Sequence, residues 1–422
     1  MNAKALNLYF DASVLGMAQY DMAARTGIYR VVDALFLALL KSDDINLNVT
    51  VTEGLEVKSH LLKYLEEVEF AKTHSLPLRT GLAQLYGILE QTRNKITATP
   101  DLFHRAGNQF LWKTMCFLKK WNKDLPQFHE NGIFHSTFWK IPEFIQNDKK
   151  LIKILTIYDL WPILSNNSGE KEQLTHIFNS LPADGWAICI SEKTRQDLLN
   201  FRKDLDPNKV KVTHLAYDSS FHSASSEEIN HVRRQVGLGD WPYFLTIGTF
   251  SERKNLPLVL NAFFAALESG KLKSERLVLV GAKKDELHKA LNFIPNAAKY
   301  SNQIVSTGYM DDSLLPALYT GALAFLYPSL YEGFGIPILE AMACQTPVLT
   351  TSAGSIPEVS GNAAILLPTH DIEAWVNSLD SIATNNSLRE QKVKLGLENC
   401  KRFSWDKCSQ STKDIYRLAL SA

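Results

Sequence analysis

Short apolar runs alternate with amphipathic stretches along the second half of the chain. The runs are YFLTIG (243–248), RLVLVG (276–281), QIVSTG (303–308), ALAFLYP (322–328), TPVLTT (346–351) and AAILLP (363–368). Strands that are apolar throughout and are separated by helices are typical of a parallel sheet covered on both faces. We therefore expect a doubly wound, Rossmann-like α/β domain here. Because several runs end in Gly or Pro, we expect the loops after them to line a ligand-binding crevice.

The first half of the chain shows the same alternation less regularly. Its apolar runs are LNLYFD (6–11), GIFHS (132–136), LIKILTIYD (151–159), WAICIS (186–191) and KVTHL (211–215). A helix is predicted from Ile28 to Leu40. The pattern indicates a second Rossmann-like domain over 1–220 and places the first-described one over 240–400. The polar segment SASSEE, within 218–240, is the expected linker between them.

Residues 55–130 do not fit this alternation. They are helical in composition, and the segment FLWKTMCFLKKW (110–121) sets Trp, Phe and Leu among Lys residues. We favour a helix that covers the first domain and keeps its Lys edge in solvent. The alternative is peripheral contact with an anionic membrane surface through Lys113, Lys119 and Lys120.

The composition limits the class of protein. A chain of 422 residues favours two domains of about 200 residues each. Its 45 Lys and Arg residues balance 45 Asp and Glu residues, so no nucleic-acid partner is expected. No apolar stretch reaches the ~20 residues of a membrane-spanning helix, and the start has no apolar leader. The five cysteines show no CxxC or Cys/His spacing, so we expect reduced thiols and no metal in a cytoplasmic protein.

The segment PSLYEGFGIPILEAMA (328–343) carries the strongest chemical signal. It directly follows a buried strand, where ligands of parallel sheets bind. Gly333 and Gly335 allow the backbone to approach a ligand closely. Pro337 suits the first turn of a helix, whose unpaired N–H groups would face the same place. The segment therefore predicts an anion site made from backbone.

Four charged side chains accompany this anion site. Glu332 and Glu340 are eight residues apart, and two carboxylates at one crevice favour recognition of hydroxyl groups, because carboxylates only accept hydrogen bonds. The segment GTFSERKNL (248–256) also follows a strand and opens a helix. Arg253 and Lys254 at a helix start are electrostatically unfavourable unless a phosphate opposes them. A ligand with both phosphates and hydroxyls fits this set.

These residues resemble the retaining, nucleotide-sugar-dependent glycosyltransferases of the GT-B fold, in the large fourth sequence family that includes bacterial mannosyltransferases. Glu332 and Glu340 match its two-glutamate motif, and Arg253 and Lys254 match its basic pair. Thr26, Gly27, Ile28 and Arg30 are similar to its N-terminal Gly loop. Further segments in family order are HSTFWKIP (135–142), YDLWPIL (158–164), TGYMDDSLLPALY (307–319), SIPEVSGNAAILLP (355–368) and RFSW (402–405).

The resemblance implies two Rossmann-like domains that face a central cleft, with residues 401–422 returning as a helix to the first domain. It implies that Arg253 and Lys254 hold the diphosphate of the donor, that Glu332 contacts the transferred sugar and that Glu340 binds the ribose. The remaining donor contacts that it implies come from Thr249, Gly333, Phe334, Gly335 and Ile336. The acceptor would meet Gly27, Tyr158 and Asp159, and neither a metal nor another cofactor is implied.

Three residues depart from the family pattern. Tyr158 stands where many relatives have His, and tyrosine is a poor base near neutral pH. His135 is a substitute candidate for this catalytic role, and the alternative is a histidine satisfied by the backbone. Thr249 replaces an Arg that would reach the diphosphate. Gln345 stands where relatives have Gly, and would be strained by about 1 kcal/mol if this position has a positive φ.

The function expected from the resemblance is retaining, metal-independent transfer of a hexosyl group onto a glycan or glycolipid of a bacterial surface polysaccharide. Mannose from GDP-mannose is the first expectation, with UDP- or dTDP-sugars as other donors. The alternatives are a nucleotide-sugar epimerase on the same scaffold and a catalytically silent binding or scaffolding subunit.

Overall fold

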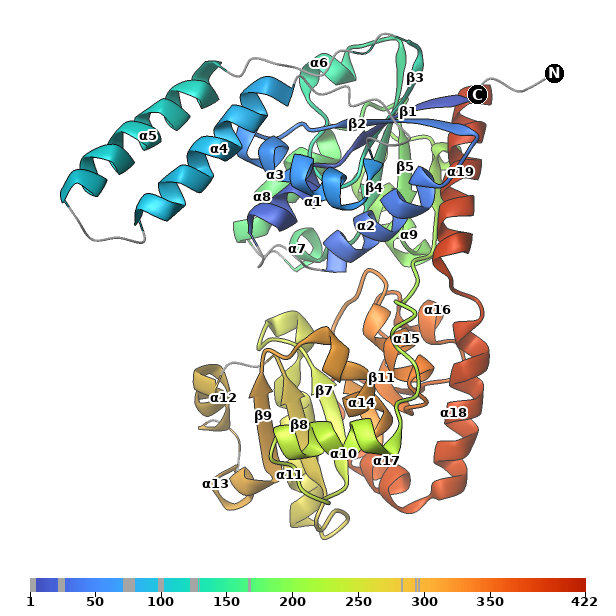
Figure 1. Ribbon diagram of the computed structural model, residues 1–422. Helices are drawn as coiled ribbons and strands as arrows, with labels where there is room; N and C mark the ends of the chain where they lie inside the picture. Colours follow the sequence, from blue (N-terminus) through green and yellow to red (C-terminus); the bar gives the residue numbers. More distant parts are fainter. Residues whose placement is uncertain are drawn as a thin grey trace. The chain divides into compact units, whose positions relative to one another are not determined.

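The computed structural model describes residues 5–21, 27–70, 80–97, 102–121, 128, 130–165, 168–281, 284–292, 294 and 297–422. The chain divides into two compact units, each with its own parallel sheet (Figure 1). The N-terminal unit consists of residues 1–189, 197–213 and 405–422, and the C-terminal unit consists of residues 190–196 and 214–404. The predicted fold class, two doubly wound α/β domains, is confirmed.

The sheet of the N-terminal unit has the strand order β2-β1-β3-β4-β5-β6, and all its pairs are parallel. The strands are β1 (Leu6–Asp11), β2 (Ile45–Thr50), β3 (Gly132–Ser136), β4 (Leu151–Ile157), β5 (Trp186–Cys189) and β6 (Val210–Val212). Alternate side chains enter different cores: Leu8 and Phe10 lie in one buried cluster and Tyr9 in another. Burial on both faces explains why these strands are apolar throughout.

Helices cover both faces of this sheet. The helices of the unit are α1 (Ser13–Tyr20), α2 (Gly27–Leu40), α3 (Leu55–Glu67), α4 (Thr80–Thr97), α5 (Leu102–Trp121), α6 (Glu143–Gln146), α7 (Trp161–Leu164), α8 (Ser168–Asn179), α9 (Glu192–Phe201, which continues from the C-terminal unit) and α19 (Trp405–Ser421). Helices α1, α2, α3 and α19 contribute to the core that contains Phe10, and α6, α8 and α9 contribute to the core that contains Tyr9.

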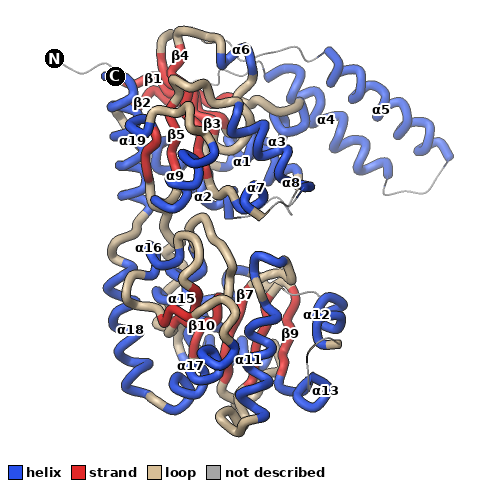
Figure 2. The backbone as a smooth tube through the Cα atoms, turned by 180° about the vertical axis from the view of Figure 1, so that it is seen from behind, coloured by secondary structure: helices blue, strands red, loops and turns tan. Residues whose placement is uncertain are grey.

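The sheet of the C-terminal unit has the order β12-β11-β10-β7-β8-β9, and Figure 2 shows its strands β10, β7 and β9. Its strands are β7 (Tyr243–Ile247), β8 (Arg276–Val280), β9 (Ile304–Gly308), β10 (Ala324–Tyr327), β11 (Val348–Thr351) and β12 (Ile365–Leu367). Its helices are α10 (Ser226–Gln235), α11 (Leu256–Glu268), α12 (Lys284–Leu291), α13 (Ala297–Tyr300), α14 (Leu315–Thr320), α15 (Ile336–Ala343), α16 (Ile356–Ser360), α17 (Ile372–Thr384) and α18 (Asn386–Cys400). Each predicted strand of this half is present, and its ends shift by at most two residues.

One local expectation was wrong, and one strand was missed. The segment SASSEE is not a linker, because Ser225 caps helix α10: its hydroxyl accepts from the N–H of Glu228, whose carboxylate accepts from the N–H of Ser225. Strand β2 was not predicted. Its sequence, INLNVT, alternates apolar and polar residues, as suits an edge strand with exposed positions.

The helical segment within 55–130 forms α3, α4 and α5. Met115 and Leu118 of α5 pack with Leu55 and Leu62 of α3 in a separate small core, and Lys119 forms an ion pair with Glu56 at 2.8 Å. These contacts support the helix-covering interpretation. None of the helices in the described ranges is long and apolar enough to cross a bilayer.

Gln345 has a φ of 60°, so the condition for strain is met. It follows α15, where the N–H of Thr346 donates to Ala341 and that of Gln345 donates to Met342. This left-handed helix ending favours glycine.

We expect Gln345→Gly to raise the free energy of unfolding by about 1 kcal/mol, measured by denaturant titration. Gln345→Ala retains the Cβ atom and is the control; a glycine variant no more stable than the alanine variant would contradict the strain.

Candidate functional site

The candidate site lies where the strand order of the C-terminal sheet reverses. The two central strands are β10 and β7. The connection after β7 leads to β8 on one side of this pair, and the connection after β10 leads to β11 on the other side. Ligands of such sheets bind at the carboxyl ends of these strands. The loops after β7 and β10 meet there, because the N–H of Leu330 donates to the carbonyl of Arg253 at 2.8 Å.

Three predicted charged residues form one group at this point. Arg253 Nη1 donates to Glu332 Oε2 at 3.0 Å, and Lys254 Nζ donates to Glu332 Oε1 at 2.7 Å. Lys254 Nζ also donates to the hydroxyl of Tyr327 at 2.9 Å. Both cations are therefore paired directly with the one carboxylate. The group has two positive charges and one negative charge, so it can bind an additional anion.

Glu332 is the innermost member of the group. Its side chain is 7 % exposed, against 18 % for Lys254 and 29 % for Arg253. Burial by itself would raise the pKa of Glu332, but the Lys254 and Arg253 charges outweigh it and hold this pKa below its ordinary value. Glu332 is therefore ionised at neutral pH, and the cations extend from it toward solvent.

The loop after Glu332 is held in a conformation that requires glycine. Gly335 has a φ of 97° and immediately precedes α15, with Pro337 in the first turn of that helix. The hydroxyl of Ser355 donates to the carbonyls of Glu332 and Phe334, each at 2.9 Å. Gly354, also left-handed, has room for no side chain, since a Cβ would lie 2.6 Å from the Glu332 carbonyl oxygen. Residues 354–355 therefore hold the loop that was predicted to form the backbone anion site.

The other predicted donor residues lie on the same elements. Glu340 is buried in α15, where the hydroxyl of Tyr319 donates to its Oε2 at 3.4 Å. Thr249 is exposed directly after β7, and Ile336 is the partly exposed first residue of α15. Gly333 and Phe334 are buried within the loop.

A cavity of about 290 Å³ lies at the carboxyl end of β4 in the N-terminal unit. Tyr158 and Asp159 line it, together with Phe138, Glu170 and Gln173. An aromatic ring beside carboxylates and an amide suits a sugar ring with its hydroxyls. Gly27 is the exposed first residue of α2, and the next residue, Ile28, lines the cavity; Thr26 lies outside the described residues. Burial raises the pKa of Tyr158, so its hydroxyl stays protonated at neutral pH.

His135 does not take the catalytic role considered for it. Its side chain is completely buried, with Nδ1 2.6 Å from the Tyr416 hydroxyl and Nε2 2.8 Å from the Thr156 hydroxyl. Burial lowers its pKa to about 3. Both ring nitrogens are therefore engaged in the core, and the backbone-satisfied alternative is also corrected, since the partners are side-chain hydroxyls.

Within the described ranges, no cluster of three or more His, Cys, Asp and Glu side chains is arranged to hold a metal ion. Three residues that support the site, Tyr327, Gly354 and Ser355, were not predicted from the sequence. Gly354 and Ser355 lie beside and in the segment 355–368. The match of that segment to the family pattern was the only sign in the sequence that residues here belong to the site.

Comparisons with known proteins find glycosyltransferases of similar sequence. Residues 229–396 match the family described as Glycosyl transferases group 1. Over 294 residues, 69 % of this chain and 75 % of the relative, the chain is 27 % identical to O-antigen chain mannosyltransferase B of Escherichia coli. It is 25 % identical to the serotype-specific mannosyltransferase WbdA of Escherichia coli over 52 % of this chain, but over 27 % of that longer protein.

Two solved structures are similar in fold. Sucrose-phosphate synthase from Thermosynechococcus elongatus has a TM-score of 0.62 at 16 % identity, covering 99 % of this chain and 100 % of the other. HepE of Anabaena, in complex with UDP and glucose, has a TM-score of 0.57 at 14 % identity, covering 97 % and 98 %. At these identities the likeness concerns the fold alone.

Proposed function

We propose that this chain, which belongs to the glycosyl transferases group 1 family and has the GT-B fold, binds its nucleotide-sugar donor at the Arg253–Lys254–Glu332 group. The observation that carries the proposal is the direct pairing of two cations with one buried carboxylate at the carboxyl ends of β7 and β10. The acceptor, a glycan or glycolipid, binds at the cavity lined by Tyr158 and Asp159.

The charges of the group suit a sugar diphosphate. The two hydrogen bonds of Lys254 use two of the three N–H groups of its ammonium, so the third can donate to a phosphate oxygen. Arg253 and the N–H of Ile336, the first residue of α15, add to the same anion site, since Pro337 has no N–H and that of Ile338 donates to Gly335. Glu332 accepts from hydroxyls of the transferred sugar, and Glu340 accepts from those of the ribose.

In the transfer step, the bond between the anomeric carbon and the diphosphate oxygen breaks while the acceptor oxygen bonds to the same face of that carbon. The proton of the acceptor hydroxyl passes to the leaving phosphate, so no protein base is needed. Arg253 and Lys254 stabilise the negative charge that develops on the leaving diphosphate. Configuration is therefore retained, and no metal ion is required.

Mannose from GDP-mannose is the donor we favour, for assembly of a surface polysaccharide at the cytoplasmic side of the membrane. The name of the Escherichia coli relative, O-antigen chain mannosyltransferase B, supports this choice. HepE, a fold neighbour, is described in complex with UDP, so UDP- and dTDP-sugars are the competing donors.

A donor screen tests the proposal. We expect calorimetry with GDP-mannose, UDP-glucose and a dTDP-sugar to show binding of one donor far above the others, unchanged by EDTA because cationic side chains hold the diphosphate. Transfer to an oligosaccharide acceptor should give a product with the anomeric configuration of the donor, measured by NMR. Failure of every donor to bind would contradict the proposal.

The same assay separates the alternatives. An epimerase would convert its donor in the absence of acceptor, and a silent subunit would bind without turnover. Either outcome would replace transfer as the function.

A further inference from the structure

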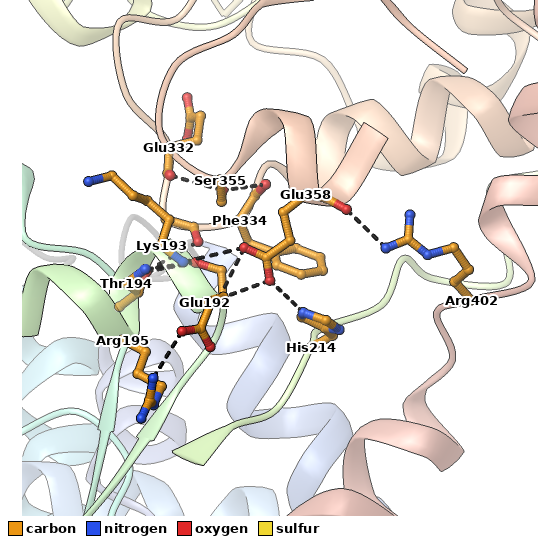
Figure 3. Close-up of polar contacts among 12 residues, drawn as sticks. Glu192, Lys193, Thr194, Arg195, His214, Glu332, Phe334, Ser355, Glu358 and Arg402 are labelled. Atoms are coloured by element: carbon orange, nitrogen blue, oxygen red, sulfur yellow. Dashed lines mark hydrogen bonds and ion pairs between the residues drawn. The ribbon is translucent and has the colours of Figure 1, made fainter. Parts of the chain in front are cut away.

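Glu358, in α16, belongs to the segment 355–368 and has no part in the donor contacts proposed above. Its carboxylate accepts hydrogen bonds from the N–H of Glu192 at 2.9 and 3.0 Å and from the N–H of Lys193 at 3.3 Å (Figure 3). His214 Nε2 lies 2.6 Å from Glu358 Oε1. Burial would raise the pKa of Glu358, but the His214 bond and these N–H groups outweigh it, so the side chain is an ionised cap on α9.

Glu358 joins segments at which the chain passes from one unit to the other. These passages follow Cys189, Gln196, Thr213 and Ser404. Within the C-terminal unit, the carboxylate of Glu358 binds the segment 190–196 and His214, and its carbonyl accepts from Arg402 Nη2 at 3.0 Å. Three connecting segments are therefore fixed to one residue of α16.

The same segments contact the loop after Glu332. The rings of His214 and Phe403 lie 5.9 and 5.6 Å from that of Phe334. The hydroxyl of Thr194 donates to the carbonyl of Gly333 at 3.3 Å, and the hydroxyl of Ser355 binds the carbonyls on either side of it (Figure 3).

These contacts fix the direction of the loop's peptide groups. The carbonyls of Glu332, Gly333 and Phe334 are all held by Ser355 or Thr194. In a trans peptide the N–H points opposite to the carbonyl, and the chain has no cis bond among its described residues. The N–H groups of 333–335 therefore point away from Ser355 and Thr194, as donors to a ligand must.

We infer that Glu358 is a positioning residue: by fixing the start of α9 and the ring of His214, it holds Thr194 and Phe334 in place and so orients the N–H groups of 333–335 for the nucleotide sugar. This inference rests on the proposed function. Its effect is on donor affinity, because Glu358 itself touches neither the proposed phosphate site nor the cavity of the N-terminal unit.

The test compares Glu358→Gln with Glu398→Gln, which removes an exposed carboxylate that pairs with Lys401 in the same unit. Glutamine has no negative charge and only one acceptor oxygen, so its NH2 group faces either the N–H groups of α9 or His214. We expect Glu358→Gln to raise KM for the donor by about tenfold, the factor that corresponds to losing one charge-assisted hydrogen bond, with kcat changed by less than about threefold. Glu398→Gln should leave both constants unchanged.

Two substitutions of His214 separate its hydrogen bond from its ring. His214→Gln retains an N–H for Glu358 and should stay within about threefold of wild type, whereas His214→Phe retains the ring contacts but should raise KM as Glu358→Gln does. If circular dichroism shows that Glu358→Gln is unfolded, the comparison of His214→Gln with His214→Phe tests the role of Glu358 instead.

Wild-type binding is measured first. Its absence would contradict the proposed function. Normal wild-type binding, with KM unchanged in Glu358→Gln or equal in the two His214 variants, would overturn the role of Glu358 alone, as would a loss confined to kcat.

Discussion

Lys254→Met is expected to lower kcat for sugar transfer by about 10²–10³-fold, the usual cost of removing one preorganised donor at developing negative charge. The ammonium of Lys254 is bonded to Glu332 and Tyr327, which aim it. Methionine retains the apolar stem but neither bonds the leaving phosphate nor neutralises Glu332. Initial rates at saturating donor and acceptor measure the effect.

The control for this variant is Lys299→Met. Lys299 is an exposed lysine of the same unit that pairs with Glu268 at 2.9 Å, and exposed pairs of this kind contribute little. Its removal should leave transfer unchanged. A Lys254→Met enzyme that retained kcat within about threefold of wild type would refute the assignment of the anion site.

The second large effect concerns stability in acid. The pKa of His135 falls from 6.5 in its ordinary state to about 3 in the folded protein, so the unfolded chain binds the proton more readily in this range. The stability that the neutral His135 side chain contributes is therefore present above pH 6.5 and is lost as the pH falls toward 3. Between about pH 6.5 and about pH 4.5, His135 alone should reduce the free energy of unfolding of the N-terminal unit by about 2 kcal/mol.

Comparison with His135→Gln isolates this contribution. The amide offers a donor and an acceptor to Tyr416 and Thr156 but does not titrate. Denaturant titrations followed over the pH range should show a shallower decline for His135→Gln than for wild type. Parallel declines would mean that the proton is taken up elsewhere.

The strand pattern predicted the two doubly wound units because strands buried on both faces must be apolar throughout. It missed β2, whose edge position allows the asparagines of INLNVT. It also misjudged SASSEE, because a run of Ser and Glu is equally suited to a linker and to a helix start, and only the reciprocal bonds of Ser225 and Glu228 distinguish them.

The site was predictable where chemistry depends on residues directly after strands. Arg253, Lys254 and Glu332 were identified in this way, and the structure brings them together. Their direct pairing could not be predicted, since it depends on how two loops approach each other. The environment of His135 could not be predicted from the sequence either, because one of its partners, Tyr416, is 281 residues away along the chain.

Helix α19 has a consequence for the order in which the protein matures during synthesis. Tyr416 and Ile415 are part of the core built around Phe10, yet they are translated after all the residues of the C-terminal unit. The C-terminal unit is complete after Ser404, so the unit begun first is finished second, in contrast to the usual N-to-C order. Until α19 is made, the core around Phe10 lacks Ile415 and Tyr416, and His135 has its bond to Thr156 but not the one to Tyr416, so the N-terminal unit reaches its final packing only after the C-terminal unit can fold.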